Sequence, residues 1–509
     1  MSDGVRDRGD VMRHDYSMKN LQEERVYHNT AVLIYLKAFR DVFGSVDVRI
    51  ANSLNQGYFT YAHMDYSLSA SDVHKIWNRM DSIIDQDLEI RKEQIRSADA
   101  AKLWRASGFK EKAELFEQRD PDEIVEIVDL DGYRNYMYCD VLPSTGYIGL
   151  FELRSYRNGL LLRLPNALHP DVIPPYRDDD KLYDAFAETK RLRKQTGIDY
   201  LADINRCIRE GEAEGLIRAS EWYQKKQIND FADMIAERGS KVVLIAGPSS
   251  SGKTTTAKRL CDAISERIGE PLYLGTDDYF VERVDNPIGS DGKPDYECLE
   301  ALDLELFNNQ MNNLIHGQEV DLPEFDFFTG TKVFGKRITR LKKNQVLVIE
   351  GIHSLNDVLT ENIDKSLKFK IYISPLTMIS IDRHNRISTA DARMLRRIVR
   401  DNQFRGYSAE STIEMWPKVR AGESVNIFPY SSSADVVFNS STAYETNLLR
   451  TYAEPLLNEI PEESAQYAEA QRIMDFMKYF EKIGEEDGSV VPDNAILREF
   501  IGPRKQGKD

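Results

Sequence analysis

The sequence predicts an α/β protein with a doubly wound parallel sheet, preceded by an α+β domain and a helical connector. Short apolar segments such as 242–246 and 346–351 alternate with helix-compatible segments between residues 239 and 459. This pattern is typical of a parallel sheet covered on both faces. A glycine-rich loop follows the first of these strands, at the end of the sheet where such folds bind ligands. We expect four parts, at residues 1–165, 166–238, 239–459 and 460–509, the last being a helical tail.

Composition restricts the classes of function. The chain has 509 residues and a formal net charge of -17, which disfavours broad binding to nucleic acid or to an anionic membrane. Its 4 cysteines are far apart and form no C-x-x-C pair, as expected for thiols in a reducing compartment. No apolar run approaches the length of a membrane span. We therefore expect a cytoplasmic protein without a nucleic-acid or membrane partner, and leave its oligomeric state open, a homo-oligomer included.

The first part of the chain combines helix and strand patterns. The segment HNTAVLIYLKAFRDVF can begin a helix capped by Asn29 or Thr30. Tyrosine-rich segments at 57–65 and 131–140 resemble strands, with a helical segment at 71–96 between them. In the connector at 166–238, apolar residues recur three and four apart, which favours helices.

A phosphate-binding loop follows the first apolar strand of the second part. Residues 247–254 match G-x-x-x-x-G-K-[ST] between a strand and a helix, a context that disfavours a chance match by a serine-rich loop. The backbone N–H groups of such a loop point at phosphate oxygens, Lys253 reaches the outer phosphates, and the Thr254 hydroxyl holds Mg²⁺. The residues expected to bind ATP are Gly247, Ser249, Ser250, Ser251, Gly252, Lys253, Thr254 and Thr255.

Two carboxylates end strands at the same edge. Asp277 ends the strand 272–275, which we expect to lie next to the strand of the phosphate loop. There its carboxylate could accept the proton of an attacking hydroxyl, and Asp278 is the neighbour with which it could be confused. Glu350 ends the strand VLVIE, where its carboxylate could hold Mg²⁺ or its waters. The alternative for either acid is a helix cap or a surface charge.

A run of arginines follows further along the chain. In RMLRRIVRDNQFRG, arginines three or four apart share one helix face, and Gly406 and the charged stretch after it suit a lid. Arginines that close over a phosphoryl group stabilise the charge that develops in the transition state. The alternative is a solvated face neutralised by Asp391 and Asp401. The arginines on this face are Arg393, Arg396, Arg397 and Arg400.

The segments 247–256, 276–280, 323–327, 349–351 and RRIVRD occur in the order seen in the uridine kinase and phosphoribulokinase family. The resemblance covers about 241–459 and is closest to uridine-cytidine kinases. It implies an ATP- and Mg²⁺-dependent kinase that phosphorylates the 5′-hydroxyl of a ribonucleoside. Asp277 would then be the catalytic base, aided by Lys253, and Thr254 and Glu350 would serve Mg²⁺. The lid would contain Arg396, Arg397, Arg400 and Arg405, and the nucleoside would lie by Tyr279, Phe280, Glu297, Phe325 and Asp326.

This chain departs from the family where the nucleoside lies. Glu297 stands where uridine kinases have an aspartate near the ribose, and Phe325 and Gly330 stand where they have a tyrosine and a histidine near the base. The sequence therefore leaves the identity of the base open. It also leaves open a different small alcohol as the acceptor, such as a sugar phosphate or pantothenate. A GTPase is disfavoured because N-K-x-D, which reads guanine, is missing from the sequence.

Residues 1–165 resemble the second additional domain of threonyl-tRNA synthetases and alanyl editing modules, so a tRNA-binding or editing-related protein is the alternative outside the kinases. His28 and Cys139 match metal-type positions of that family, whereas Val32 and Pro143 stand where it has two further histidines. Two ligands are too few for a four-coordinate zinc site. We therefore expect a dismantled editing site in a binding or spacer domain.

Overall fold

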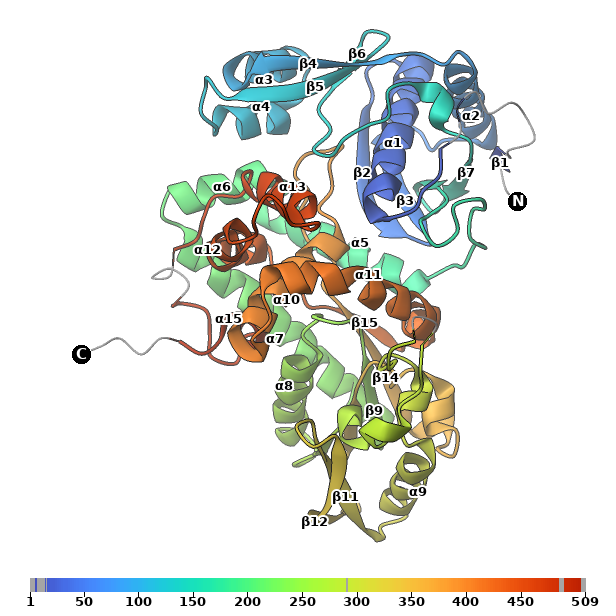
Figure 1. The fold of residues 1–509 in the computed structure, drawn as a ribbon, viewed down its shortest axis with the longest axis vertical. Helices are drawn as coiled ribbons and strands as arrows, with labels where there is room; N and C mark the ends of the chain where they lie inside the picture. The colour runs from blue at the N-terminus through green and yellow to red at the C-terminus, as the bar shows by residue number, and fades with distance from the viewer. Residues whose placement is uncertain (1–4, 7–13, 15, 290–291, 485–488, 505–509) are drawn as a thin grey trace. The chain divides into compact units, whose positions relative to one another are not determined.

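The computed structural model describes residues 5–6, 14, 16–289, 292–484 and 489–504. These residues form two compact units (Figure 1). Unit 1 comprises Met1–Asp179, Lys190–Arg206 and Ile379–Ile387. Unit 2 comprises Asp180–Thr189, Cys207–Met378 and Ser388–Asp509.

The helices in the described residues are α1 (Leu21–Phe43), α2 (Ala70–Asp85), α3 (Ser97–Ala106), α4 (Lys110–Glu117), α5 (Asp180–Thr196), α6 (Leu201–Arg209), α7 (Ala213–Arg238), α8 (Lys253–Ser265), α9 (Leu304–Ile315), α10 (Thr389–Arg405), α11 (Ala409–Asn426), α12 (Glu445–Asn458), α13 (Tyr467–Met477) and α15 (Arg498–Ile501). The strands are β1 (Val5–Arg6), β2 (Asp47–Leu54), β3 (Gly57–His63), β4 (Ile90–Arg96), β5 (Ile124–Leu130), β6 (Tyr133–Asn135), β7 (Phe151–Tyr156), β8 (Gly159–Arg163), β9 (Val242–Ala246), β10 (Leu272–Gly275), β11 (Glu319–Asp326), β12 (Thr331–Arg340), β13 (Leu347–Glu350), β14 (Lys368–Ser374) and β15 (Val436–Asn439).

A parallel sheet with the order β10-β13-β9-β14-β15 is the framework of unit 2. Strand β9 is buried along its whole length, as its continuous apolar sequence predicts. Gly275 pairs with Glu350, and Glu350 pairs with Ile245, so three neighbouring strands end at the same level. The segments that follow these strands therefore meet at one edge. Strand β13 lies between β10 and β9, so the expectation that the strand of Asp277 is next to the phosphate-loop strand is wrong. The predicted α/β class with a parallel sheet is confirmed.

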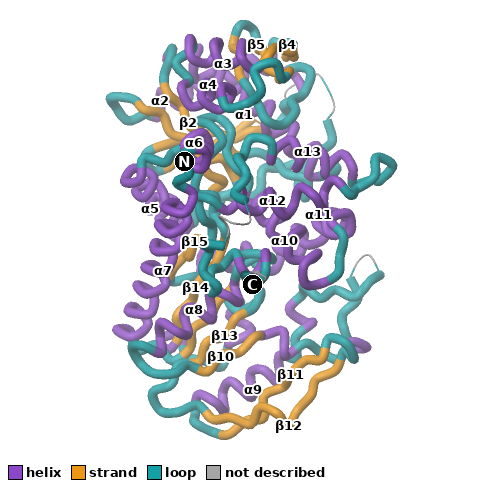
Figure 2. Tube along the Cα trace, turned by 90° about the vertical axis from the view of Figure 1, so that its left-hand side faces the viewer, coloured by secondary structure: helices purple, strands orange, loops and turns teal. Residues whose placement is uncertain are grey.

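Helices cover this sheet, and a β-hairpin extends from it. Helix α8 packs on β9 and β13. It lies beside α7 (Figure 2). Helix α10 packs against α11, α12 and α15. The antiparallel hairpin β11–β12 contacts α9. A hydrophobic core beneath these elements includes Leu244, Leu274, Phe307 and Ile349.

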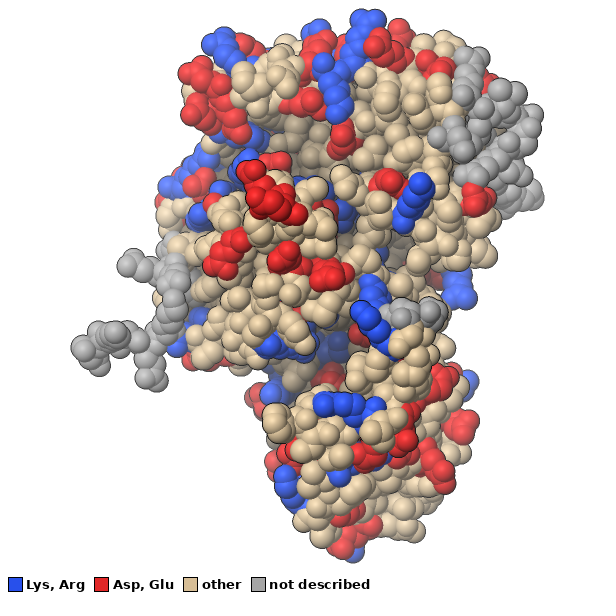
Figure 3. All heavy atoms as spheres, in the orientation of Figure 1, with Lys and Arg blue, Asp and Glu red and all other residues tan. Residues whose placement is uncertain are grey.

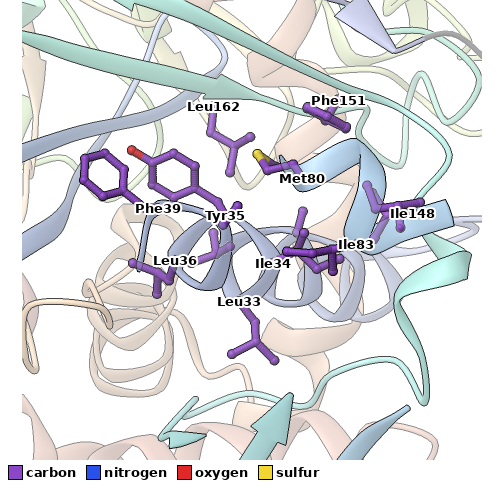
Figure 4. Packing of buried hydrophobic residues seen from close by; sticks show 14 of the residues in the cluster. Leu33, Ile34, Tyr35, Leu36, Phe39, Met80, Ile83, Ile148, Phe151 and Leu162 are labelled. Carbon is purple, nitrogen blue, oxygen red and sulfur yellow. The ribbon is translucent and has the colours of Figure 1, made fainter. Parts of the chain in front are cut away.

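Unit 1 is an α+β fold with antiparallel sheets ordered β1-β7-β8-β3-β2 and β4-β5-β6. The long helix α1 supplies much of the core. Figure 4 shows Ile34 and Tyr35 on the side of α1 that faces α2 and the sheet, and Leu33 on the opposite side. Leu33, Ile34 and Tyr35 are at most 1% exposed. Because consecutive residues of α1 are buried, this helix packs on more than one face.

Some local predictions for unit 1 are wrong. Helix α1 begins at Leu21, because the side chain of Asn20 accepts from Glu23 N and caps it, while Thr30 lies inside the helix and donates to Val26 O. The segment 71–96 is a helix only as far as Asp85, and its last residues form β4. These residues pair with β5, so a tertiary contact overrides their helical pattern.

The units do not coincide with the expected boundaries at 165 and 238. Residues 166–179 stay with unit 1 because Asp178 accepts from Tyr156 Oη at 2.8 Å and from Asn55 Nδ2 at 3.2 Å. The connector sequence contributes residues to both units. Residues 379–387 of the second half of the chain also belong to unit 1, where Arg383 forms a bidentate pair with Glu111.

Candidate active site

The phosphate loop connects β9 to α8. Ser250 and Gly252 have φ values of 59° and 81°, and these left-handed residues turn the loop back over the start of the helix. Ser250 Oγ and Ser251 Oγ are buried and have no hydrogen-bond partner among the described residues. Buried hydroxyls beside a helix N-terminus suit the oxygens of a phosphate chain.

A hydrogen bond between Thr254 and Glu350 joins the start of α8 to the end of β13. The Thr254 hydroxyl donates to Glu350 Oε1 at 2.8 Å, and Tyr273 Oη donates to the same oxygen at 3.2 Å. Burial raises the pKa of Glu350, and Lys253 opposes this shift. A hydroxyl and a carboxylate are hard oxygen ligands that fit Mg²⁺, which prefers such donors together with water. These two residues could therefore hold the ion that accompanies a bound nucleotide.

Gly351, directly after Glu350, keeps this arrangement compact. A Cβ atom at Gly351 would lie 1.8 Å from Thr276 Oγ1, so the close approach of the two strand ends requires glycine. Thr276 opens the segment that carries Asp277 and Asp278.

Asp277 and Asp278 have different surroundings. Asp278 accepts from Arg337 Nη1 at 2.6 Å and from Phe325 N at 3.4 Å, so it fastens the hairpin β11–β12. Among the residues that the structure describes, Asp277 makes no hydrogen bond or ion pair, and its side chain is exposed to solvent. The surrounding protein atoms still reduce its hydration and raise its pKa, while Lys253 opposes the shift and Asp278 adds to it. Because water reaches the carboxylate, screening limits the size of this shift.

Cations surround the mouth of this site. Lys253 Nζ donates to Pro248 O at 3.2 Å and lies within electrostatic reach of Asp277 and Glu350. Arg405, whose side chain is 51% exposed, also lowers the pKa of Asp277. Figure 3 shows basic and acidic side chains meeting within unit 2 in the hollow between α10 and the lobe that carries β11 and β12.

Helix α10 presents its arginines to the phosphate loop, but three of them are buried, two almost completely. Arg393 is 1% exposed, donates to Ser249 O at 2.9 Å and pairs with Glu423. Arg396 is 0% exposed and forms a bidentate pair with Glu445 at 2.6 and 2.7 Å. Both residues support the loop, and their burial does not match the expectation of mobile lid arginines.

The other arginines of α10 share Asp401. Arg397 Nε lies 3.2 Å from an Asp401 oxygen, Arg400 Nη2 donates to Asp401 at 2.7 Å, and Arg405 Nε lies 3.7 Å away. Arg397 also donates to Ser249 Oγ at 2.7 Å. Asp401 thus partly neutralises this face, as the alternative interpretation expected, whereas Asp391 pairs with Arg472 instead.

The residues expected to contact the nucleoside fall into separate groups. Phe280 lies edge-on to Phe325, with ring centroids 5.7 Å apart, and Phe327 and Tyr296 join this cluster. Tyr279 is 0% exposed and donates to Gln310 Oε1 at 2.6 Å, so it belongs to the core. We expected Tyr279 beside the nucleoside, but a fully buried side chain does not face a ligand site.

Asp326 and Gly330 shape the turn of the hairpin. Asp326 Oδ1 accepts from Phe328 N at 2.8 Å and from Thr329 N at 3.3 Å, so one of its oxygens is engaged in the turn. Gly330 has φ 74°, and a Cβ atom there would lie 2.7 Å from the side chain of Arg283. The glycine is therefore required by this turn, apart from any change in substrate recognition.

Glu297 lies close to the phosphate loop. Burial raises its pKa, the nearby Glu423 raises it further, and Arg397 and Lys253 oppose these effects. A Cβ atom at Gly422 of α11 would lie 3.1 Å from Glu297 Cβ, so the helix packs directly on this side chain.

Sequence reasoning missed Glu423 and Arg337. Glu423 is 0% exposed and accepts from Ser249 N at 3.0 Å, which fixes one end of the phosphate loop. Arg337 holds Asp278 from the hairpin. Neither residue belongs to a local motif, so only the fold reveals its contact.

In unit 1, His28 is fully engaged. Its Nδ1 lies 2.9 Å from Tyr58 Oη and its Nε2 lies 2.8 Å from Pro165 O. Within the described ranges, no group of three or more His, Cys, Asp or Glu side chains is placed to hold a metal ion. None of the helices in the described residues is long and apolar enough to cross a membrane.

Unit 2 thus combines a phosphate-binding loop with carboxylates at the ends of neighbouring strands. The family model described as "Phosphoribulokinase / Uridine kinase family" matches residues 242–447. A uridine kinase of Deinococcus deserti is 28% identical over 198 residues, which cover 38% of this chain and 86% of that protein. A uridine kinase of Halobacterium salinarum is 27% identical over 207 residues, which cover 40% of this chain and 83% of that protein.

A solved structure of a possible uridine kinase from Bacillus stearothermophilus is 21% identical and covers 42% of this chain and 99% of its own, with a TM-score of 0.27, too low to support an assignment. The family match and the curated relatives carry the assignment. Residues 242–447 match the family model and form a P-loop kinase domain of the uridine kinase/phosphoribulokinase type. The protein is a phosphotransferase with an alcohol acceptor.

Proposed function

We propose that the protein is an ATP-dependent nucleoside kinase that transfers the γ-phosphoryl group of ATP to the 5′-hydroxyl of a ribonucleoside, with Mg²⁺ as the metal. The observation that carries the proposal is the placement of Asp277. Its carboxylate is exposed at the strand edge beside Lys253, whereas Asp278 is fastened to Arg337. The curated relatives named uridine kinases support a nucleoside acceptor.

Asp277 would accept the proton of the attacking hydroxyl as the phosphoryl group departs, and its raised pKa makes it a stronger base than an ordinary aspartate. Lys253 and the loop amides would hold the phosphates, and Thr254 and Glu350 would hold Mg²⁺. The metal would neutralise charge on the phosphate oxygens. Arg397, Arg400 and Arg405 share one carboxylate, Asp401, and would together neutralise the charge that develops during transfer. Arg393 and Arg396 are each bound to a separate buried glutamate.

Glu297 is the proposed partner of the ribose. A carboxylate can accept hydrogen bonds from two sugar hydroxyls, and it lies within electrostatic reach of Lys253 and Arg397. The base would meet the aromatic cluster of Phe280, Phe325 and Phe327. Stacking on such rings tolerates different bases, because every base has an aromatic face. We therefore propose a firm requirement for ribose and a relaxed choice of base.

An acceptor panel tests this function. Uridine, cytidine, adenosine, guanosine and inosine would compete for one limiting pool of ATP, with a sugar phosphate and pantothenate as alternative acceptors. We expect nucleoside 5′-monophosphates with preferences below about a hundredfold between bases. Exclusive use of the sugar phosphate or pantothenate would contradict the nucleoside assignment, and a larger preference for one base would contradict the relaxed choice.

A matched pair of variants tests the role of Glu297. Glu297→Gln keeps the shape of the side chain but weakens its hydrogen bonds to hydroxyls, so we expect KM for the nucleoside to rise by about tenfold while KM for ATP changes little. Glu300→Gln changes an exposed carboxylate three residues away and is the control. Equal KM values for Glu297→Gln and the control would remove Glu297 from the acceptor site.

A further inference from the structure

The C-terminal segment Ala495–Gly502 rests on the phosphate loop. A Cβ atom at Gly252 would lie 2.4 Å from Ile496 Cγ2, so the loop glycine packs against this segment. The Phe500 ring centroid lies 5.0 Å from the guanidinium carbon of Arg396. Ile496 and Phe500 are at most 1% exposed. The segment lies beyond residues 242–447, the part of the chain that the family model matches.

Within this segment, the Glu499 carboxylate binds a backbone N–H group at the start of α8. Glu499 Oε2 accepts from Thr255 N at 3.1 Å and from Thr255 Oγ1 at 2.8 Å. The first N–H groups of a helix have no partner inside the helix, and in a phosphate loop they cradle the α- and β-phosphates of a nucleotide. The carboxylate thus holds a position that a phosphate oxygen would take.

The Glu499 carboxylate also lies within electrostatic reach of Glu350, the proposed Mg²⁺ ligand. A bound nucleotide brings further negative charge to the same place. Phosphate and carboxylate therefore repel each other and also require the same N–H group, while the buried Ile496 and Phe500 keep the segment anchored.

We propose that Glu499 is a donor-site residue that competes with the nucleotide phosphates for the Thr255 amide and thereby sets the affinity for the phosphoryl donor. The inference rests on the proposed function in taking ATP as that donor. When nucleotide binds, the Glu499 side chain turns away from Thr255, and the apolar residues on either side hold the segment in place. A phosphate of the nucleotide then accepts from the Thr255 amide in place of the Glu499 carboxylate.

The test measures binding in the full-length protein with three ligands, namely MgATP, ADP and inorganic pyrophosphate. Glu499→Gln keeps the size of the side chain and removes its charge, and Glu499→Ala removes the competing oxygens. Asp493→Asn makes the same change of charge in the same stretch, at a carboxylate that is 74% exposed and pairs with Arg504. It is the matched control.

We expect both Glu499 variants to bind all three ligands about tenfold more tightly than the wild type, the size of one charge-assisted hydrogen bond, and Asp493→Asn to bind as the wild type does. The rise in melting temperature on adding ADP should be larger in Glu499→Gln. Unchanged or weaker pyrophosphate binding in both variants would overturn the inference, even if turnover of ATP is normal. Tighter pyrophosphate binding without any ATP binding would support it and would contradict the proposed function.

Discussion

The Thr254 hydroxyl donates to Glu350 Oε1 at 2.8 Å and so joins the phosphate-loop helix to the neighbouring strand end. This bond fixes the edge of the sheet at which Asp277 stands, because Gly275 and Glu350 are paired in register. Chemistry that needs a phosphate chain, a metal and a base can therefore take place at one edge.

Replacing Asp277 should separate binding from catalysis. Asp277→Asn cannot accept the hydroxyl proton, while the phosphate loop is unchanged, so we expect kcat to fall by about a thousandfold or more and ATP affinity to change by less than about threefold. Steady-state kinetics and nucleotide titration measure the two effects.

Asp278→Asn is the matched control for this change. It weakens the contact with Arg337 and should lower stability and raise the KM of the acceptor more than it lowers kcat. Near-normal turnover in Asp277→Asn together with an inactive Asp278→Asn would show that Asp278 is the base.

The pH dependence of kcat/KM should reflect the raised pKa of Asp277. The base acts only when ionised, so the rate should fall as the pH drops through a pKa above that of an ordinary aspartate, about 3.9. Arg405 lowers this pKa, so Arg405→Gln should move the acid limb to higher pH besides reducing kcat. An acid limb at the same pH in both proteins would contradict the proximity of Arg405 to the base.

Unit 1 should hold no stoichiometric zinc. His28 is engaged by Tyr58 and Pro165, and Val32 and Pro143 cannot supply further ligands. Elemental analysis of the purified full-length protein should find far less than one zinc per chain after dialysis against a weak chelator. One tightly held zinc that is lost in His28→Ala would restore the editing interpretation.

The buried pair of Lys112 and Asp382 should stabilise unit 1. Both side chains are 0% exposed, and Lys112 Nζ lies 3.7 Å from Asp382 Oδ1. Burial lowers the pKa of Lys112 and raises the pKa of Asp382. Lys112→Met would leave the carboxylate uncompensated, which typically costs about 3–5 kcal/mol. The double variant Lys112→Met with Asp382→Asn should be less damaged than Lys112→Met alone. Thermal unfolding of the full chain measures both, and equal losses would contradict a coupled pair.

The sequence was sufficient to predict the parallel sheet and the residues of local motifs. Continuous apolar strands and the phosphate-loop pattern depend on neighbouring residues, so Lys253, Thr254 and Glu350 could be placed at one edge. Contacts between distant segments could not be predicted. Glu423 and Glu499 meet the phosphate loop at Ser249 and Thr255 only because α11 and the C-terminal segment fold back onto it.

Burial was the other property that the sequence concealed. Tyr279 is adjacent to the reaction edge in sequence, yet its side chain points into the core and bonds Gln310. Arg396 has the sequence pattern of a lid arginine, yet Glu445 and Phe500 enclose it. A motif thus indicates which residues are near a site but not which side chains face it.

The most direct test of the account is to incubate the protein with Mg²⁺, ATP labelled in its γ-phosphoryl group, and either uridine or 5′-deoxyuridine, and to identify the labelled product. We predict label in the nucleoside 5′-monophosphate from uridine, transfer reduced to background with 5′-deoxyuridine, and transfer reduced to background with uridine in Asp277→Asn. Label transferred equally to both nucleosides, or to neither while a sugar phosphate or pantothenate is labelled, would contradict the assignment of a ribonucleoside 5′-kinase.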